Sequence, residues 1–305
     1  MFLDVLTQVV ILLILIMLGF LLTRVKMLSE ITVKQMTDVV LTLVTPSVII
    51  KSFIREFNPN TLKNLLTSFL IAVLLHIGCL ILSRIIIKDK NGNRQKVLQF
   101  STVFSNCGFM AVPLLQSLIG DIGVFYGASF IAIFNIFVWS YGVILMNGKN
   151  SSISPKKLIL NPGIISVFIG LLIYFLNIPI PKIIYEPISF MSALNTPLPM
   201  IIIGFHLANS NILNGLRDIK VLYAIFVKLF LFPALGLLGM YLCGVRGDVL
   251  VACTICASAP TAAITTMFSV KYKGDTPLSV STVSLSTVLS VISMPILITL
   301  AQSNA

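Results

Sequence analysis

Long uninterrupted apolar runs constrain the fold of this sequence more than any other feature. A helix needs roughly 20 apolar residues to cross the hydrocarbon core of a bilayer, and the sequence contains ten such runs. Their approximate bounds are 4–23, 35–54, 62–87, 97–118, 122–146, 158–177, 187–208, 219–244, 249–270 and 277–301. A transmembrane β-barrel would need alternating segments of about ten residues instead. We therefore predict an all-α integral membrane protein with ten transmembrane helices.

The charged residues are few and unevenly placed. They make up 10% of the chain, and the net charge of +11 would suggest nucleic acid in a soluble protein. Most lysines and arginines, however, fall in loops after odd-numbered runs. The opposite side holds only Lys51, Arg55, Lys63, Lys182 and Arg246. This positive-inside bias predicts extracytoplasmic N- and C-termini and no nucleic-acid partner. The first run has no basic segment before it, so we expect a retained helix rather than a signal peptide.

The two halves of the sequence share features at matching positions. Pro46 in "TPSVIIKSF" and Pro199 in "LPMIIIGFH" are separated by nearly the same offset as Asp121 and Asp275, which both follow a glycine. Five helices in each half is an odd number, so two copies of one unit must insert in opposite orientations. This pattern is typical of the inverted repeats of secondary transporters.

Two of the apolar runs are weakened at corresponding positions. "FSNCGFMAVPLL" (104–115) contains Asn106, Cys107 and Pro113, and "CASAPTAAITT" (256–266) contains Pro260 and Thr261. A broken helix in hydrocarbon leaves backbone groups unsatisfied unless it is buried or lines a cavity. Paired breaks therefore point to a binding site near the midplane, where helix N-termini favour an anion. The alternative is that proline only kinks these helices and that the small polar residues hold helices together.

Lys228 is the one charged residue well inside an apolar run, and His76 lies in the matching helix of the first half. An intramembrane lysine is a functional candidate by default. It could be the counter-ion of an anionic substrate or a protonatable group that couples transport to protons. It could also snorkel, or bond to carbonyls freed by Pro233. His76 could titrate near neutral pH or be structural.

Four segments together resemble the auxin efflux carrier (PIN-like) family, which includes plant auxin carriers and bacterial malate and malonate permeases. They are "LGFLLTRVKMLSEITVKQMTDVVLTLVTPSVIIKSF" (18–53), "FSNCGFMAVPLLQSLIGDIGVFYGASFIAIFNIFVWSYGVIL" (104–145), "KLFLFP" (228–233) and "ASAPTAAITTMFSVKYKGD" (257–275). The resemblance implies two inverted five-helix repeats with crossed, broken helices 4 and 9, as in sodium/proton antiporters and bile-acid symporters. It also implies a homodimer, an elevator-type movement, and Asn135 and Ser47 as substrate neighbours.

The same resemblance divides the chain into a scaffold and a transport domain. The expected parts are scaffold helices 1–2 (1–60), transport-domain helices 3–5 (61–147), a cytoplasmic linker (148–157), scaffold helices 6–7 (158–215) and transport-domain helices 8–10 (216–305). On this plan the substrate is held beside the crossing helices.

Other functional classes are less well supported by the sequence. A sodium/proton antiporter of this architecture would want aspartates at the crossover, where there are none, and no protease or ATP-binding motif is present. The cysteine pattern predicts neither a disulfide framework nor a metal site, and we expect no cofactor. We therefore predict a secondary active transporter of small organic anions in the plasma membrane, with the proton as a candidate coupling ion. The alternative is a membrane sensor that binds a small ligand without sustained flux.

Overall fold

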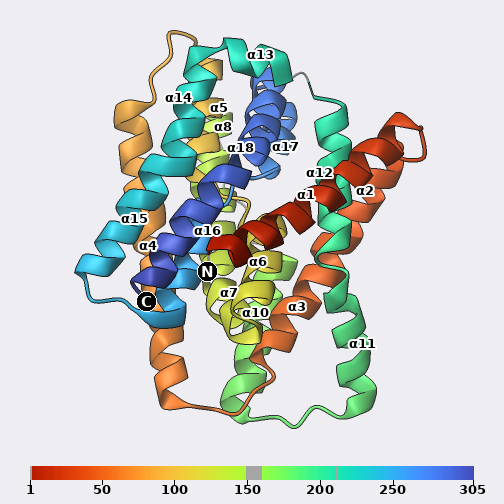
Figure 1. Ribbon diagram of the computed structural model, residues 1–305, viewed down its shortest axis with the longest axis vertical. Helices are drawn as coiled ribbons and strands as arrows, with labels where there is room; N and C mark the ends of the chain where they lie inside the picture. The colour runs from red at the N-terminus through yellow and green to blue at the C-terminus, as the bar shows by residue number, and fades with distance from the viewer. Residues whose placement is uncertain (1, 149–159, 211) are drawn as a thin grey trace.

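The computed structural model describes residues 2–148, 160–210 and 212–305, and helices make up nearly all of its secondary structure (Figure 1). The helices of the first half are α1 (Phe2–Arg24), α2 (Glu30–Val39), α3 (Thr45–Phe53), α4 (Pro59–Ile86), α5 (Gly92–Val103), α6 (Val112–Leu118), α7 (Asp121–Phe137) and α8 (Val143–Asn147). Those of the second half are α10 (Pro162–Leu176), α11 (Lys182–Ala193), α12 (Pro197–Ala208), α13 (Ile212–Arg217), α14 (Ile219–Phe226), α15 (Phe232–Leu242), α16 (Gly247–Ser258), α17 (Ile264–Lys271) and α18 (Thr276–Ser303). The prediction of an all-helical chain is confirmed. The expected linker at 148–157 lies, except for its first residue, outside the described residues.

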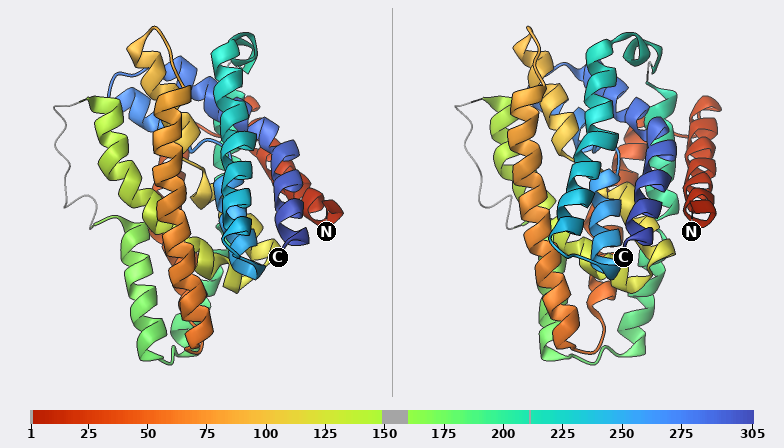
Figure 2. Two further views of the ribbon diagram at one scale, coloured as in Figure 1. Left: turned by 90° about the vertical axis from the view of Figure 1, so that its left-hand side faces the viewer. Right: turned by 60° about the vertical axis from the view of Figure 1, so that its left-hand side comes forward.

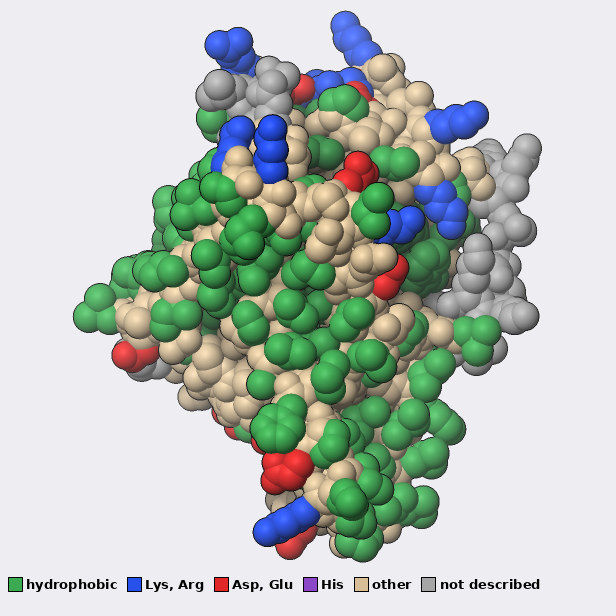
Figure 3. Space-filling view, turned by 90° about the vertical axis from the view of Figure 1, so that its right-hand side faces the viewer, with side chains coloured by type: hydrophobic (Ala, Val, Ile, Leu, Met, Phe, Trp, Pro, Cys, Tyr) green, Lys and Arg blue, Asp and Glu red, His purple; other side chains and the backbone are tan. Residues whose placement is uncertain are grey.

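Seven helical segments of the described chain are long and apolar enough to cross a membrane. They are Phe2–Arg24, Glu30–Phe53, Pro59–Ile86, Asp121–Asn147, Lys182–Ala208, Ile219–Leu242 and Thr276–Ser303. Three shorter apolar helices accompany them, namely Cys107–Leu118, Pro162–Leu176 and Gly247–Ser258. Hydrophobic side chains cover the middle of the molecule, and lysines and arginines gather at one end of its long axis (Figure 3). This distribution is that of a multi-pass membrane protein.

Proline explains most of the irregular turns inside the long helices. Four five-residue π-helical turns occur in the described chain: η1 (Val40–Val44), η2 (Cys107–Ala111), η3 (Val138–Gly142) and η4 (Val227–Leu231). Pro46, Pro113 and Pro233 directly follow η1, η2 and η4, each as the second residue of the next helix. A proline ring clashes with the carbonyl of the preceding turn. The chain accommodates this by widening that turn.

The first helix packs along α12 at very short range. A Cβ atom added to Gly19 would lie 2.3 Å from the carbonyl oxygen of Ile201, and one added to Gly204 would lie 2.1 Å from that of Ile16. Both distances are far below van der Waals contact with a rigid backbone. Glycine is therefore required at both positions, as in other close crossings of membrane helices.

Two helices are interrupted at the centre of the molecule, and the interruptions face each other. The chain is extended at Phe104, which ends α5, and at Ala259, which ends α16. The amide of Asn106 donates to the carbonyl of Pro260 at 2.7 Å, and the amide of Ala262 donates to the carbonyl of Phe104 at 2.9 Å. The two breaks thus satisfy each other's backbone groups, as a buried interruption in a membrane helix must.

Candidate functional site

The first break is organised by Asn106, which caps the helix that follows it. Its side-chain oxygen accepts a hydrogen bond from the amide of Phe109 at 3.3 Å, and its carbonyl accepts from the amide of Met110. Cys107 is the first residue of η2 and is buried, and Pro113 is the second residue of α6, which follows η2. A helix therefore begins in the protein interior, where its unpaired amides form a region of positive potential.

The second break is fixed by bonds to three other segments. The amide of Thr261 donates to the Ser286 hydroxyl of α18 at 3.2 Å, and its own hydroxyl donates to the Ser101 carbonyl of α5 at 3.0 Å. The carbonyl of Pro260 accepts from Asn106. Both Thr261 groups are thus used inside the protein, and Thr261 is fully buried. In this conformation Thr261 holds the breaks in register.

Lys228 lies against both breaks. It is 2% exposed, and its ammonium donates to the Ser105 hydroxyl and, at 3.1 Å, to the carbonyl of Ala257. Ala257 belongs to the last turn of α16, whose free carbonyls carry partial negative charge. No carboxylate of the described chain forms an ion pair with Lys228. The lysine thus bonds to a carbonyl freed by the break at Pro260, not by Pro233.

His76 lies on α4 and lines the same small cavity as Lys228 and Ser105. Nδ1 of the ring is 2.7 Å from the carbonyl oxygen of Ala72, and a carbonyl can only accept, so Nδ1 carries a hydrogen. The ring stacks on Phe137 with centroids 5.3 Å apart. The cavity, of about 20 Å³, is large enough for roughly one water molecule.

Two of the residues expected near the substrate are engaged elsewhere. The Ser47 hydroxyl donates to the carbonyl of Leu43 in its own helix, and α3 packs chiefly on α10, α11 and α7. The Asn135 amide donates to the carbonyl of Ile131, and its oxygen accepts from Asn161, which caps α10. The structure places Asn106, Cys107, Pro260, Thr261, Lys228 and His76 around the crossover, with Pro113 in the helix that follows Cys107. The hydrogen bonds of the Ser47 and Asn135 side chains go to other partners.

Sequence reasoning did not assign roles to the hydroxyl groups that support the crossover. Ser105 accepts from Lys228 and itself donates to the Ala257 carbonyl at 3.2 Å. Ser286 is one of many buried serines and threonines along α18. The sequence signal was present, because "STVSLSTVLSVIS" repeats a hydroxyl every one to three residues in an apolar helix. Such a face is typical of close packing between membrane helices.

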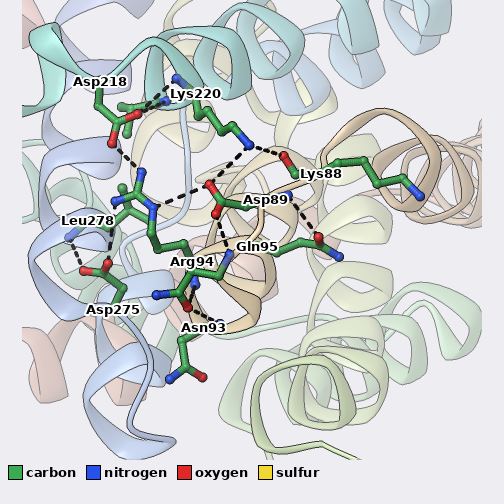
Figure 4. Close-up of polar contacts among 11 residues, drawn as sticks. Lys88, Asp89, Asn93, Arg94, Gln95, Asp218, Lys220, Asp275 and Leu278 are labelled. Atoms are coloured by element: carbon green, nitrogen blue, oxygen red, sulfur yellow. Dashed lines mark hydrogen bonds and ion pairs between the residues drawn. The ribbon is translucent and has the colours of Figure 1, made fainter.

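A cluster of charges at the basic end of the molecule joins three of the helices near the crossover (Figure 4). Arg94, in the first turn of α5, forms an ion pair with Asp218, which caps α14, and with Asp275, which caps α18, at 3.8 Å. It also contacts Asp89 at 3.5 Å. Nothing in the sequence indicates that one arginine joins these three acids.

The charges of this cluster shift one another's pKa values. Hydrogen bonding to Asp218 raises the pKa of Arg94 above its ordinary value. Partial burial raises the pKa of Asp218, but the hydrogen bond and charge of Arg94 outweigh it, and the net shift is downward. The pKa of Asp89 is lowered by the Asn91 amide, with Lys220 and Arg94 adding to the effect. All three groups are therefore held in their charged forms.

Comparison with known proteins gives one family. The sequence model of a family described as membrane transport protein matches residues 4–155 and residues 150–298. No curated protein matches the chain. The matched segments include both breaks, Lys228 and His76.

Proposed function

The chain belongs to the membrane transport protein family of auxin efflux carrier-like transporters, which are not enzymes, and from this premise we propose that it is a secondary active carrier. Its substrates on this proposal are small organic anions, such as mono- or dicarboxylates or auxin-like acids, carried across the plasma membrane. The observation that carries the proposal is the buried meeting of two broken helices beside Lys228. Membership of a transporter family supports the functional class, and the positive potential of this site supports an anionic substrate.

The site favours an anion for two reasons. The helix that begins after Asn106 presents amide groups and the positive end of its dipole to the interior. Lys228 adds a full positive charge that no carboxylate of the described chain neutralises. An organic anion beside Asn106 and Cys107 would meet both sources of positive potential. A carboxylate could accept a hydrogen bond from the side-chain NH2 group of Asn106 while its apolar part lies toward Pro113.

An arrangement of ten spans in two inverted repeats accounts for the observed helices. The seven long spans and the three shorter apolar helices support a total of ten spans, and the facing breaks support a crossover of helices 4 and 9. Packing supports part of the proposed division of the chain: α1 packs on α12 and α3 on α10 and α11 within scaffold segments 1–60 and 158–215, while α3 also packs on α7 and α1 on α18 of the transport segments. Arg94 in turn joins α5 to α14 and α18, all within transport segments 61–147 and 216–305.

We assign the basic end of the molecule to the cytoplasm on the positive-inside rule. Both chain termini lie at a similar height along the long axis (Figure 2), which is compatible with extracytoplasmic ends on the same side. A homodimer through the scaffold, and an elevator movement of the transport segments against it, complete the proposal.

Coupling is proposed to pass through the protonation of Lys228. In its charged form the ammonium connects Ser105 of the first break to Ala257 of the second. Loss of a proton would weaken that connection, because an uncharged amine is a poorer donor. His76, which lines the same cavity, is placed to exchange a proton with Lys228 through one water.

The test is a ligand screen followed by flux measurements. Detergent-purified protein is heated with malate, malonate or indole-3-acetate, and a ligand at about 100 times its Kd should add about 2.7 kcal/mol of stability. The control is Asn106→Asp, which keeps the capping oxygen but adds a negative charge and should respond to no carboxylate. Ligands that stabilise the protein are then tested for uptake into proteoliposomes.

Three outcomes separate the candidate functions. Stabilisation of the unmodified protein with uptake supports the carrier. Stabilisation without uptake identifies a sensor that binds and does not transport. Stabilisation by neutral or cationic solutes instead of carboxylates would contradict the assignment of an anionic substrate.

A further inference from the structure

An open apolar groove lies at the basic end of the molecule, between the end of α4 and the start of α14. It has a volume of about 480 Å³ and is lined by Ile86, Lys88, Ile219, Lys220, Leu222, Tyr223 and Phe226. This volume is in the range of sites that bind small organic ligands. None of these residues belongs to the crossover site.

The groove exists because α4 and α14 do not pack closely at this end. Both pack against α5, and α4 meets α15 farther along. Tyr223 is 46% exposed and Phe226 is 55% exposed, and the Phe226 ring stacks on Phe230, with centroids 5.9 Å apart. The aromatic wall therefore continues from the groove toward the middle of the membrane-spanning surface.

Two lysines stand at the polar end of the groove. The Lys220 ammonium donates to the carbonyl of Lys88 at 2.8 Å and lies 3.5 Å from Asp89. The Lys88 ammonium forms no ion pair with any residue of the described chain, and it points away from the charge cluster (Figure 4). Asp89 is shared with Arg94, which also pairs with Asp218 and Asp275. The Lys88 ammonium is therefore the positive charge of the groove that no carboxylate of the described chain pairs with.

We propose that this groove is a binding site for an anionic phospholipid. One acyl chain lies along Leu222, Tyr223 and Phe226, and the phosphate lies at the Lys88 ammonium, with the charge of Lys220, which is bonded to the Lys88 carbonyl, adding to the attraction. Basic pockets between helices on the cytoplasmic side of membrane proteins bind such head groups. A free phosphate ion would use the two lysines but would leave the aromatic wall uncovered. The inference rests on the placement of this end at the membrane surface and not on the identity of the transported anion.

The test compares the retention of two lipids that differ only in head-group charge. The protein is purified in detergent, mixed with phosphatidylglycerol or phosphatidylcholine of identical chains, and bound lipid is counted by native mass spectrometry. Each lysine near an anionic surface contributes about 1 kcal/mol, or about fivefold in affinity. The variant with Lys88→Gln and Lys220→Gln should therefore bind phosphatidylglycerol about 25-fold more weakly and phosphatidylcholine unchanged.

Two controls separate this site from general attraction to charge. The variant with Lys26→Gln and Lys34→Gln removes the same charge from the α1–α2 region of the same basic side and should retain phosphatidylglycerol normally. Phe226→Ser should weaken both lipids by removing part of the acyl-chain wall. Excess inorganic phosphate should compete poorly.

The proposal is overturned if the two lysine pairs have equal effects, if Phe226→Ser changes nothing, or if phosphate displaces the lipid fully. The last result would identify a site for soluble phosphate. Because the screen of carboxylates does not involve this groove, a failure of the lipid site and a failure of the proposed transport function can be distinguished. Size-exclusion profiles and melting temperatures establish that each variant is folded.

Discussion

Replacing Lys228 with methionine removes a buried charge while keeping an unbranched side chain of similar length. In the unmodified protein the ammonium donates to the Ser105 hydroxyl and to the Ala257 carbonyl. After the replacement, Ser105 still donates to the Ala257 carbonyl at 3.2 Å. That carbonyl therefore keeps a hydrogen-bond partner, and the break in α16 is not left unsatisfied.

The effect on folding should be small because two large contributions oppose each other. Hydrogen bonds from a charged group contribute about 1.5–3 kcal/mol each. Burying an unpaired ion costs several kcal/mol in return. Since Lys228 is 2% exposed and has no acidic partner among the described residues, methionine recovers that desolvation cost. We expect the melting temperature of Lys228→Met to stay within a few degrees of the unmodified protein, about 1 kcal/mol of stability.

The effect on anion binding should be much larger. Nζ contacts Ser105, and Asn106 is the next residue, about 3.8 Å away between Cα atoms, so an anion on Asn106 would lie within about 8 Å of Nζ. At an effective dielectric constant of about 20, that distance corresponds to about 2 kcal/mol. Loss of the charge should therefore weaken binding about 30-fold.

The assay is the thermal-shift titration with the carboxylate found in the screen, followed by proteoliposome uptake. Lys182→Met, at the exposed start of α11, is the matched control and should bind and transport normally. A Lys228→Met protein with unchanged affinity and flux would refute both the counter-ion and the coupling role. If the affinity is unchanged but transport no longer depends on a proton gradient, Lys228 acts in coupling and is not the counter-ion of the substrate.

Three further predictions test the cap, the close crossing and the charge cluster. Asn106→Ala should lose about 1 kcal/mol of stability, as removal of a helix cap does, and should also lose its response to carboxylates. Melting curves recorded with and without carboxylate separate the two effects. Gly204→Ala should destabilise the protein by about 3 kcal/mol or more, because the new methyl group would clash with the backbone of α1. The control Gly239→Ala, whose methyl group would contact nothing within 4 Å, should not destabilise the protein. Equal melting temperatures of the two variants would contradict the close crossing. The pKa of Asp218 is lowered in the folded protein, so its ionised form stabilises the fold above the ordinary aspartate pKa near 4, and this stability is lost as the pH falls below that value. The melting temperature of the unmodified protein should therefore fall more between about pH 6 and about pH 3 than that of Arg94→Gln. Parallel curves would show that Arg94 does not cause the shift.

The residues of the crossover were partly accessible to sequence reasoning. Asn106 and Pro260 were identified because a break is unusual in an apolar helix, and the structure joins them through one backbone hydrogen bond. Ser105, which lies in the break itself, was missed as a partner of Lys228, since a serine side chain carries no sign of what it contacts across 123 positions of the chain. The expected contribution of Ser47 and Asn135 followed from resemblance, and both side chains bond to their own helices.

The sequence alone determined the helical class, the approximate spans and the positions of the breaks. These properties are local: the apolar length of a helix, the missing amide of proline and the distribution of lysines along the chain are set by neighbouring residues. Only the tertiary structure decided that Lys228 lies at the end of α16 and that Arg94 joins the ends of α14 and α18. Those contacts depend on how distant helices pack, and in a membrane that packing is governed by van der Waals fit and interhelical hydrogen bonds, which the periodicity of a single sequence does not encode.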